Sequence, residues 1–301
     1  MTQQTTPPAW IAVDWGTSNL RVSLMYADGT SHCLTSDQGM SSLNPDGFEP
    51  ALLALIDDHL GTGVTPVVIC GMAGSRQGWA EAPYIATPCN PPSLAEAVSV
   101  RANDPRIAVS ILPGVKQEKP ADVMRGEETQ IAGYLTQNPD FDGVLCLPGT
   151  HSKWVHISAK EIVSFRTFMT GEMFALLTKQ SVLRFSVQDE IDLDAFDIAV
   201  GDALSRPETV GADLFALRAG TLLGSLSEGA ARGRLSGLLI GTELAGARPY
   251  WLGRDIALIG AGSLTTLYQR ALALQGITAP TVSGEDMVIS GLTAAHTQTK
   301  V

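Results

Sequence analysis

The chain has 301 residues and a formal net charge of −11, with 45% hydrophobic and 17% charged residues. This length and apolar content suffice for one large or two ordinary domains and exclude extensive disorder. The acidic balance argues against a nucleic-acid-binding protein, which normally carries a basic surplus. No apolar stretch reaches membrane-spanning length, and residues 1–9 lack the basic and apolar regions of a signal peptide.

The first third of the chain predicts strands alternating with short helices. Strands are expected in four apolar, β-branched runs: Trp10–Asp14, Leu20–Met25, Val64–Cys70 and Ile107–Leu112. A further strand should follow the turn Tyr26–Thr30. Helices are expected where apolar residues recur at helical spacing, at Phe48–Leu60 and near Leu94–Val100.

The rest of the chain predicts a second α/β half that is richer in helix. Helices are expected at Arg125–Thr136, from Thr170 onward, over most of Gln188–Glu228 and at Leu264–Gln275. Strands are expected at Glu161–Phe168 and Ile256–Gly260. We therefore predict an N-terminal lobe, 1–124 plus about 290–301, and a C-terminal lobe, 125–289. The helix Arg125–Thr136 is the expected first crossing, and Gly284–His296 the expected return.

Two segments far apart in the chain repeat the same pattern. I-A-V-D-W-G-T-S-N-L-R-V (Ile11–Val22) aligns without a gap with V-L-C-L-P-G-T-H-S-K-W-V (Val144–Val155). Each predicts a strand, a Gly-Thr turn with a serine, and a second strand. Backbone N–H groups and hydroxyls in such a turn can cradle phosphate oxygens. Two copies, one per half, favour an ATP-dependent phosphotransferase.

Several residues near these turns are candidates for binding ATP and Mg²⁺. Asp14, at the end of the first strand, can hold Mg²⁺ through water, although a turn aspartate also caps its own backbone. The candidate phosphate ligands are Gly16, Thr17, Ser18, Gly149, Thr150, Ser152 and Lys153. Lys153 is equally compatible with an exposed strand position. The late turn Gly260-Ala261-Gly262-Ser263 precedes a helix and suits adenosine. A full G-x-G-x-x-G and a P-loop are both absent from the sequence.

A kinase acting on an alcohol also needs a carboxylate that accepts the hydroxyl proton. Glu127 and Glu128 begin the helix before the second turn, where acids also stabilise the helix dipole. Of the two we favour Glu128. A substrate carboxylate would suit arginine and a loop rich in donors. The candidates for this role are Arg21, Gly74, Ser75, Arg76, Gln77 and Arg166.

The motifs together resemble a known superfamily, that of sugar kinases, hexokinase, heat-shock ATPases and actin. The finer matches are D-W-G-T-S-N-L-R, G-M-A-G-S-R-Q-G-W, M-R-G-E-E-T-Q, L-P-G-T-H-S-K-W and F-x-T-F-M-T-G-E-x-F. With L-L-I-G-T-E-L and I-G-A-G-S-L they are similar to the 2-dehydro-3-deoxygalactonokinase family over nearly the whole chain. The wider superfamily usually has Asp where this chain has Glu127-Glu128. Relatives that place the base in the second turn also differ, because His151-Ser152-Lys153 has no carboxylate.

The resemblance implies an α/β fold with two ribonuclease-H-like lobes and an active-site cleft between them, the actin-like ATPase fold. It implies ATP- and Mg²⁺-dependent phosphorylation of the 6-hydroxyl of 2-dehydro-3-deoxy-D-galactonate in galactonate catabolism. Asp14 would support the metal, the two turns the phosphates and Gly260–Ser263 the adenosine. The expected partners are the sugar acid and ATP, with a homodimer as an option and no nucleic acid or membrane.

Three alternatives stay open from the sequence. The first is a kinase for another sugar or sugar acid, since no residue type separates galactonate from gluconate stereochemistry. The second is an actin-like ATPase without a sugar acceptor, and the third is a sugar-binding protein without catalysis. The four cysteines, Cys33, Cys70, Cys89 and Cys146, show no C-x-x-C pair or zinc spacing. They predict a reduced protein in the cytoplasm.

Overall fold

The computed structural model describes residues 6–298, which divide by their internal contacts into two units. Unit 1 is formed by residues 6–141, 158–163 and 284–298, and unit 2 by Asp142–Ile157 and Ser164–Ser283. Residues 1–5, part of the segment examined for a signal peptide, lie outside the described residues. So does 299–301, the end of the predicted N-terminal lobe.

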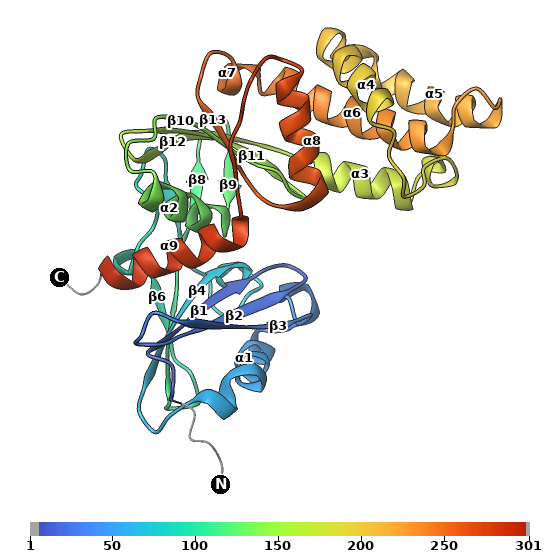
Figure 1. The fold of residues 1–301 in the computed structure, drawn as a ribbon. Helices are drawn as coiled ribbons and strands as arrows, with labels where there is room; N and C mark the ends of the chain where they lie inside the picture. The colour runs from blue at the N-terminus through green and yellow to red at the C-terminus, as the bar shows by residue number, and fades with distance from the viewer. Residues whose placement is uncertain (1–5, 299–301) are drawn as a thin grey trace. The chain divides into compact units, whose positions relative to one another are not determined.

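Unit 1 is built on a mixed six-stranded sheet in the order β3-β2-β1-β4-β7-β6 (Figure 1). Its strands are β1 (Trp10–Trp15), β2 (Leu20–Met25), β3 (Ser31–Ser36), β4 (Thr65–Gly71), β6 (Val98–Val100) and β7 (Ile107–Ile111). A small second sheet contains β5 (Tyr84–Ala86), β8 (Gly114–Gln117) and β9 (Asp122–Met124). The helices of the unit are α1 (Phe48–Ile56), α2 (Glu127–Gln137) and α9 (Gly284–Gln298).

The alternation of side chains along β1 decides which face of this sheet carries polar groups. Ile11, Val13 and Trp15 pack into the core that contains Phe48 and Leu52 of α1. Trp10 and Ala12 pack on the opposite face, with Val288 and Leu292 of α9. Because successive residues of a strand point to opposite faces, Asp14 lies on the α9 face, at the end of the strand.

Helices α2 and α9 meet backbone to backbone within unit 1. A Cβ at Gly133 of α2 would lie 2.0 Å from the Met287 carbonyl oxygen. A Cβ at Gly291 of α9 would lie 2.0 Å from the Thr129 carbonyl oxygen. This packing places residues 125–141 in unit 1, whereas the sequence boundary at residue 125 assigned them to the C-terminal lobe. The passages between the units follow Phe141 and Ser283, with an excursion at residues 158–163.

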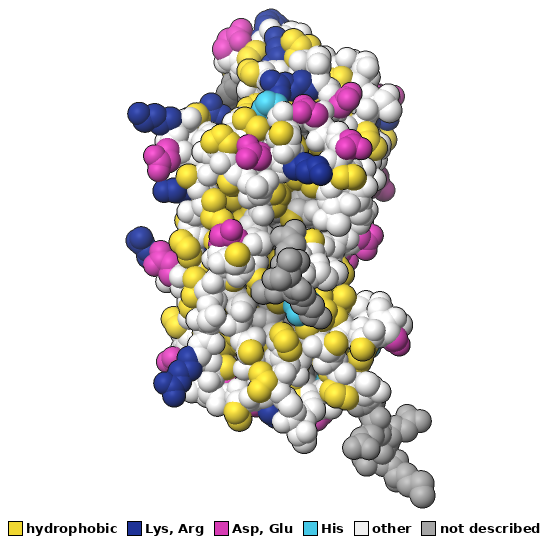
Figure 2. All heavy atoms as spheres, turned by 90° about the vertical axis from the view of Figure 1, so that its left-hand side faces the viewer, with side chains coloured by type: hydrophobic (Ala, Val, Ile, Leu, Met, Phe, Trp, Pro, Cys, Tyr) yellow, Lys and Arg dark blue, Asp and Glu magenta, His cyan; other side chains and the backbone are white. Residues whose placement is uncertain are grey.

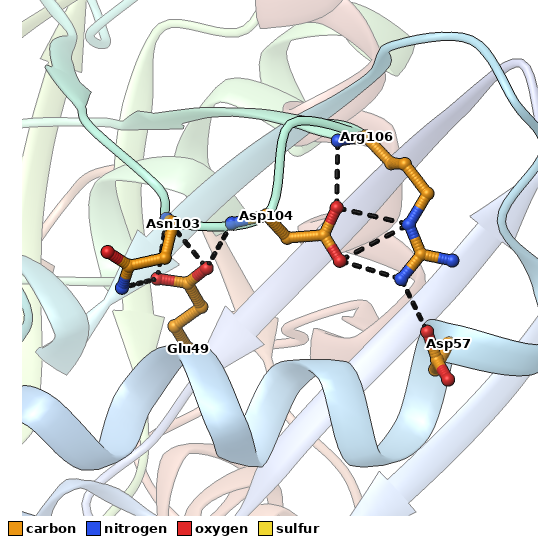
Figure 3. A network of polar contacts seen from close by, with 5 residues as sticks. All are labelled: Glu49, Asp57, Asn103, Asp104 and Arg106. Atoms are coloured by element: carbon orange, nitrogen blue, oxygen red, sulfur yellow. Dashed lines mark hydrogen bonds and ion pairs between the residues drawn. The ribbon is translucent and has the colours of Figure 1, made fainter.

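Figure 3 shows a buried carboxylate that stabilises unit 1 through backbone hydrogen bonds. Glu49 of α1 accepts the N–H groups of Asn103 and Asp104, both at 2.8 Å from Oε1. The Asn103 side-chain amide donates to Glu49 Oε2 at 2.9 Å. Asp104 in turn pairs with Arg106, which also contacts Asp57. The network thus ties α1 to the loop that precedes β7.

Unit 2 combines a five-stranded sheet, in the order β12-β11-β10-β13-β14, with a large helical layer (Figure 1). Its strands are β10 (Gly143–Leu147), β11 (Ser152–Ser158), β12 (Glu161–Phe168), β13 (Ile256–Ile259) and β14 (Thr281–Val282). Its helices are α3 (Thr170–Lys179), α4 (Leu193–Ser205), α5 (Val210–Leu222), α6 (Glu228–Gly246), α7 (Arg248–Trp251) and α8 (Gly262–Ala273). The predicted helical stretch 188–228 is therefore confirmed, with its break at Pro207.

The predicted helix near Leu94–Val100 is wrong. Ser93 and Glu96 form a capping box, but the helical turn that they start is a 3₁₀ turn ending at Glu96. Val98–Val100 then pairs antiparallel with β7 as the edge strand β6. Residues 98–100 therefore make their backbone hydrogen bonds to β7 instead of within a longer helix.

The two repeated segments both form antiparallel hairpins, but their registers differ. Asp14 pairs with Arg21 across the first hairpin, and Leu147 pairs with Lys153 across the second. In the ungapped alignment Asp14 matches Leu147 and Leu20 matches Lys153. The two strands of the second hairpin are therefore paired one residue out of the register of the first, and the acidic position of the first hairpin is apolar in the second.

The surface of the described residues carries charges of both signs. On the face drawn in Figure 2, Lys and Arg side chains lie among Asp and Glu. Among the described residues, no helix combines the length and the apolar character needed to cross a membrane.

Candidate active site

The backbone of the first turn, Gly16–Asn19, is held by hydrogen bonds from Met40 and Ser41, and its side chains are exposed. The N–H groups of Met40 and Ser41 donate to the carbonyl oxygens of Gly16 and Thr17, at 3.1 and 2.9 Å. The Ser41 hydroxyl also donates to the Thr17 carbonyl oxygen, at 2.8 Å. Thr17 and Ser18 are exposed. Their hydroxyls are thus available to an incoming polar ligand.

Asp14 lies beside this turn in a cluster of opposite charges. Its Oδ2 is 3.7 Å from Arg21 Nη1, and its side chain is 25% exposed. Arg21 Nε is also 3.2 Å from Glu285 Oε1 on α9. Burial raises the pKa of Asp14 and Arg21 acts in the opposite direction, while Glu127 adds to the rise. Arg21, a predicted substrate ligand, therefore already has two carboxylate partners.

The head of α2 brings Glu127 and Glu128 close to this cluster. The chain enters the helix through Gly126 at φ +111°, a backbone conformation that favours glycine. The Gly126 N–H donates to both carboxylate oxygens of Glu128, at 2.7 and 2.8 Å. The Arg125 N–H donates to Glu127 Oε2 at 3.0 Å. Both acids thus satisfy backbone donors at the start of the helix.

The two glutamates differ in their access to solvent and substrate. Glu128 is 1% exposed, whereas Glu127 is half-buried. Burial, reinforced by the charge of Glu127, raises the pKa of Glu128 to about 7. Glu128 is therefore partly protonated at neutral pH and enclosed by protein. Glu127 is the more accessible member of the pair.

The loop that follows β4 lies against Arg125, which precedes this helix. Arg125 Nη2 donates to the Ala82 carbonyl oxygen at 2.8 Å, and its guanidinium lies 4.3 Å from the centroid of the Tyr84 ring. A Cβ at Gly74 would lie 2.7 Å from Arg125 Nη1. Nη1 of Arg125 and Oγ of Ser75 are buried, and neither has a hydrogen-bond partner among the described residues.

The other predicted substrate residues are distributed differently. The Arg76 side chain is 81% exposed and lies 3.7 Å from Glu81, and Gln77 is exposed beside it. Arg166 is exposed on β12 in unit 2, whereas the other predicted substrate ligands all belong to unit 1. Arg125 is not one of the predicted substrate ligands, although it lies two residues before Glu127 in the sequence.

The second turn is anchored through a buried side chain of its own, that of Ser152. Ser152 is 0% exposed, and its Oγ lies 2.8 Å from the Tyr268 hydroxyl and 3.4 Å from the Gly149 nitrogen. Lys153 is also buried and has further contacts. Thr150 is exposed, and its carbonyl oxygen accepts the Glu172 N–H of α3 at 3.0 Å. His151 pairs with the Glu172 carboxylate at 2.6 Å.

A buried carboxylate in α6 organises the residues beneath this turn. Glu243 Oε1 accepts the Trp154 indole N–H at 2.7 Å, and its Oε2 accepts the Tyr268 hydroxyl at 2.6 Å and the Thr170 hydroxyl. Glu243 is 1% exposed. Burial raises its pKa, and the hydrogen bonds act in the opposite direction. Burial and Glu243 hold the pKa of Tyr268 well above its usual value, so the phenol stays protonated.

A cavity of about 710 Å³ opens beside this turn within unit 2. It brings together the predicted phosphate ligands Gly149 and Thr150 with Ser263 of the predicted adenosine turn. Its other walls come mainly from α3, α4, α6 and α8 and are largely apolar. The size and lining suit a small organic ligand with one polar end.

The adenosine turn has the backbone geometry that its glycines predict. The Gly260 N–H donates to the Val282 carbonyl oxygen at 2.9 Å, which pins the end of β13. Gly262 begins α8 at φ +74°. Ala261 and Ser263 on either side are exposed. The start of α8, with its first backbone N–H groups, therefore borders the cavity that Ser263 lines.

The donor set around Asp14 is compatible with Mg²⁺. A hard cation of this kind is held in kinases by one or two carboxylates, with waters and substrate phosphates completing its shell. Asp14 supplies one carboxylate, and the charge of Glu127 acts on it. Among the described residues no group of three or more acidic, histidine or cysteine side chains could hold a metal by itself.

Comparison with known proteins gives one consistent result. The sequence profile described as 2-keto-3-deoxy-galactonokinase matches residues 14–295. A probable 2-dehydro-3-deoxygalactonokinase of Rhizobium meliloti is 39% identical and covers 97% of each chain. The 2-dehydro-3-deoxygalactonokinase of Escherichia coli is 37% identical, covering 94% of this chain and 96% of its own.

Solved structures extend the comparison to the fold. The crystal structure of a putative 2-dehydro-3-deoxygalactonokinase from Sinorhizobium meliloti superposes with a TM-score of 0.87, at 38% identity over 97% of this chain and 99% of that one. Component A of the (R)-2-hydroxyglutaryl-CoA dehydratase of Acidaminococcus fermentans superposes with a TM-score of 0.50 at 11% identity, over 97% and 99% of the two chains. The second likeness concerns the fold alone.

Proposed function

The chain belongs to the 2-keto-3-deoxy-galactonokinase family, and we propose that it transfers the γ-phosphoryl group of ATP to the 6-hydroxyl of 2-dehydro-3-deoxy-D-galactonate. The products are ADP and 2-dehydro-3-deoxy-6-phosphogalactonate. The predicted α/β class and actin-like ATPase fold are confirmed, as is the prediction of a phosphotransferase with an alcohol acceptor.

The observation that carries the proposal is the cavity beside the second turn. Its lining combines Gly149, Thr150 and Ser263 of the two turns with walls from α6 and α8. These walls are mainly apolar, through Leu239, Ile240, Leu264 and Leu267, and also carry Arg232, Ser236 and Thr266. A nucleotide has the same division, with an anionic tail and a largely apolar base. The N-termini of α3 and α8 both border this cavity, and helix N-termini favour anions. We assign the phosphates to the turn and the adenosine to the helical walls.

The proton acceptor in this proposal is Glu127, supported by Glu128. Glu127 takes the proton of the 6-hydroxyl while that oxygen attacks the γ-phosphorus, and ADP leaves with the electrons of the broken P–O bond. The sequence favoured Glu128, but a side chain that is 1% exposed cannot touch substrate without rearrangement. Its contacts with Gly126 instead hold the head of α2.

Asp14 is the residue that would hold Mg²⁺, which when bound neutralises phosphate charge. The hydroxyls and N–H groups of Thr17 and Ser18 remain proposed phosphate ligands, and both residues are exposed and close to Asp14 in the sequence. The Gly16 N–H donates to the Asn19 carbonyl oxygen at 2.9 Å, so Gly16 contributes to this proposal through the shape of the turn. Lys153 and Gly260–Gly262 stay part of the proposed nucleotide site.

The carboxylate of the sugar acid is proposed to bind near the loop after β4. Gly74, Ser75, Arg76 and Gln77 bring backbone and side-chain donors to one short segment, and Arg125 lies against Gly74. Arg21 and Arg166 remain further candidates from the sequence. Binding at this distant group can position the reacting hydroxyl without touching it. A cytoplasmic location and a homodimer belong to the same proposal.

A coupled ADP-release assay tests the proposed function. We expect turnover with 2-dehydro-3-deoxy-D-galactonate, and at least about tenfold lower kcat/KM with the gluconate epimer and with hexoses. Without an acceptor, ADP release should fall to background. Equal ADP release with and without sugar acid would instead identify an actin-like ATPase, and preference for a hexose would identify a different sugar kinase.

A further inference from the structure

We propose that Glu243 is a positioning residue for nucleotide binding, which acts through Tyr268 and Ser152 on the turn Gly149–Ser152. The inference rests on the proposed function in one respect, because it assigns the nucleotide phosphates to this turn. Glu243 itself touches no ligand in this scheme. It holds the turn in the shape that receives the phosphates.

Glu243 lies on the face of α6 that lines the cavity. Arg232, Ser236 and Ile240 of α6 line the cavity, and they recur every four residues along one face. Glu243 follows on the same face, about three residues further on, beneath the end of the cavity. The helix that forms the apolar wall therefore carries one buried acid where that wall approaches the turn.

The hydrogen bonds between Glu243 and the turn have fixed directions. An ionised carboxylate only accepts, so Tyr268 must donate its single hydroxyl proton to Glu243. Ser152 must then donate to the Tyr268 oxygen. The Ser152 oxygen is left to accept the N–H of Gly149, 3.4 Å away. The Glu243 carboxylate thus sets the donor-to-acceptor direction of a series of hydrogen bonds that ends at the backbone of the turn.

The other two donors to Glu243, Trp154 and Thr170, connect the same carboxylate to the elements that surround the turn. Trp154 belongs to β11, the strand that leaves the turn. Thr170 is the first residue of α3 and itself lines the cavity. A Cβ at Gly171 would lie 2.3 Å from the Gly149 carbonyl oxygen, so α3 packs directly on the turn. One side chain thereby fixes β11, α3 and α8 together.

The cost of burying this acid supports a role beyond packing. Removing a carboxylate from water costs several kcal/mol, and a well-packed apolar residue of similar volume is often no worse for stability. All five side chains of the cluster, Glu243, Tyr268, Trp154, Ser152 and Thr170, are buried. The arrangement gains a unique geometry for the turn, which an apolar cluster would not impose.

The test compares the binding of ATP and adenosine by isothermal titration, in the full-length protein without sugar acid. Tyr268→Phe removes the hydroxyl that bonds to both Glu243 and Ser152. We expect its Kd for ATP to rise roughly tenfold, while its Kd for adenosine changes less than about twofold. In turnover, the KM for ATP should rise and the KM for the sugar acid should stay unchanged.

Two further variants sharpen the test. In Glu243→Gln the amide oxygen can still accept from Trp154, and the amide N–H groups can donate to Thr170 and Tyr268, so the links persist with reversed direction. We expect a rise of roughly threefold in the Kd for ATP. Glu49→Gln is the matched control, since Glu49 is also a buried, multiply bonded glutamate (Figure 3). It should lower Tm without changing the ratio of the two affinities.

The proposal is overturned if Tyr268→Phe lowers Tm as Glu49→Gln does while the affinity for ATP stays the same. It is equally overturned if ATP and adenosine lose the same factor, because the defect then lies in the cavity as a whole. Should Tyr268→Phe not fold, Ser152→Ala carries the same expectation with a smaller change in volume. If the wild type binds ATP but gives no sugar-dependent ADP release, the proposed function fails while the binding comparison still decides this inference.

Discussion

The two Gly-Thr turns start from nearly the same sequence and are held in opposite ways. The first is tied at its backbone carbonyls by Met40 and Ser41, which leaves Thr17 and Ser18 exposed. The second is tied at the Thr150 carbonyl by Glu172 and, in addition, through the buried side chain of Ser152, which leads inward to Glu243. The first has an acid, Asp14, where the second has Leu147. The repeated sequence therefore predicts the same hairpin turn twice, whereas the residues beside each turn differ in charge and so differ in the groups that they can bind.

The largest expected effect concerns the acids beside the first turn. Glu127→Gln should lower kcat by about 10²- to 10⁴-fold, the usual contribution of a general base, while ATP binding is retained. Glu128→Gln should keep at least about a tenth of the wild-type kcat, because its side chain is enclosed. Single-turnover phosphoryl transfer and ATP titration separate these effects.

The reverse ranking would move the catalytic assignment to Glu128. Loss of ATP binding in Glu127→Gln would instead show that this residue serves the nucleotide rather than the acceptor. Glu49→Gln provides the reference for a buried glutamate whose hydrogen bonds go to Asn103 and Asp104 rather than to either turn.

The second effect is a pH dependence of stability that belongs to unit 1. The pKa of Glu128 rises from 4.5 to about 7 on folding, so the folded chain keeps a proton that the unfolded chain has lost in this interval. The stability due to this group is full below about pH 4.5 and falls as pH rises through 7, by about 3 kcal/mol in all. Urea unfolding of wild type and Glu128→Gln from pH 5 to 8 measures the difference. A constant difference would contradict the raised pKa.

The smallest effect compares one serine from each turn. Ser152→Ala should lower the free energy of unfolding by about 1–2 kcal/mol, since it leaves the buried Tyr268 oxygen without its donor. Ser18→Ala should change it by less than about 0.5 kcal/mol, because Ser18 is exposed. Thermal unfolding of both variants provides the measurement. Equal losses would show that the turns are supported in the same way.

Features that depend on neighbouring residues were predictable from the sequence. The hairpins, the buried strands β4 and β13, and the helix α8 after its glycine turn follow from local periodicity and turn residues. Trp154, Thr170, Glu243 and Tyr268 were not recognised as a cluster. Their contacts join residues 25 to 89 positions apart, and Glu243 lies near the end of α6, after the apolar run Leu238–Ile240.

The wrong helix prediction has the same origin. The segment 94–100 has a true helix start at Ser93, but pairing with β7 decides its second half. The preference for Glu128 over Glu127 came from its neighbour Thr129 in the sequence, whereas the enclosure of Glu128 depends on the way Gly126 turns the chain. Local patterns locate candidate residues, and packing then decides which of them a ligand can reach.

The crossing of α2 and α9 has a consequence for biosynthesis. Unit 1 begins with the first strand but is closed by a helix that starts at Gly284. A ribosome must therefore translate past Gly284 before α2, which carries Glu127 and Glu128, gains its partner helix. A polypeptide that stops short of this residue has the two acids on a helix without the backbone surface against which Gly133 packs.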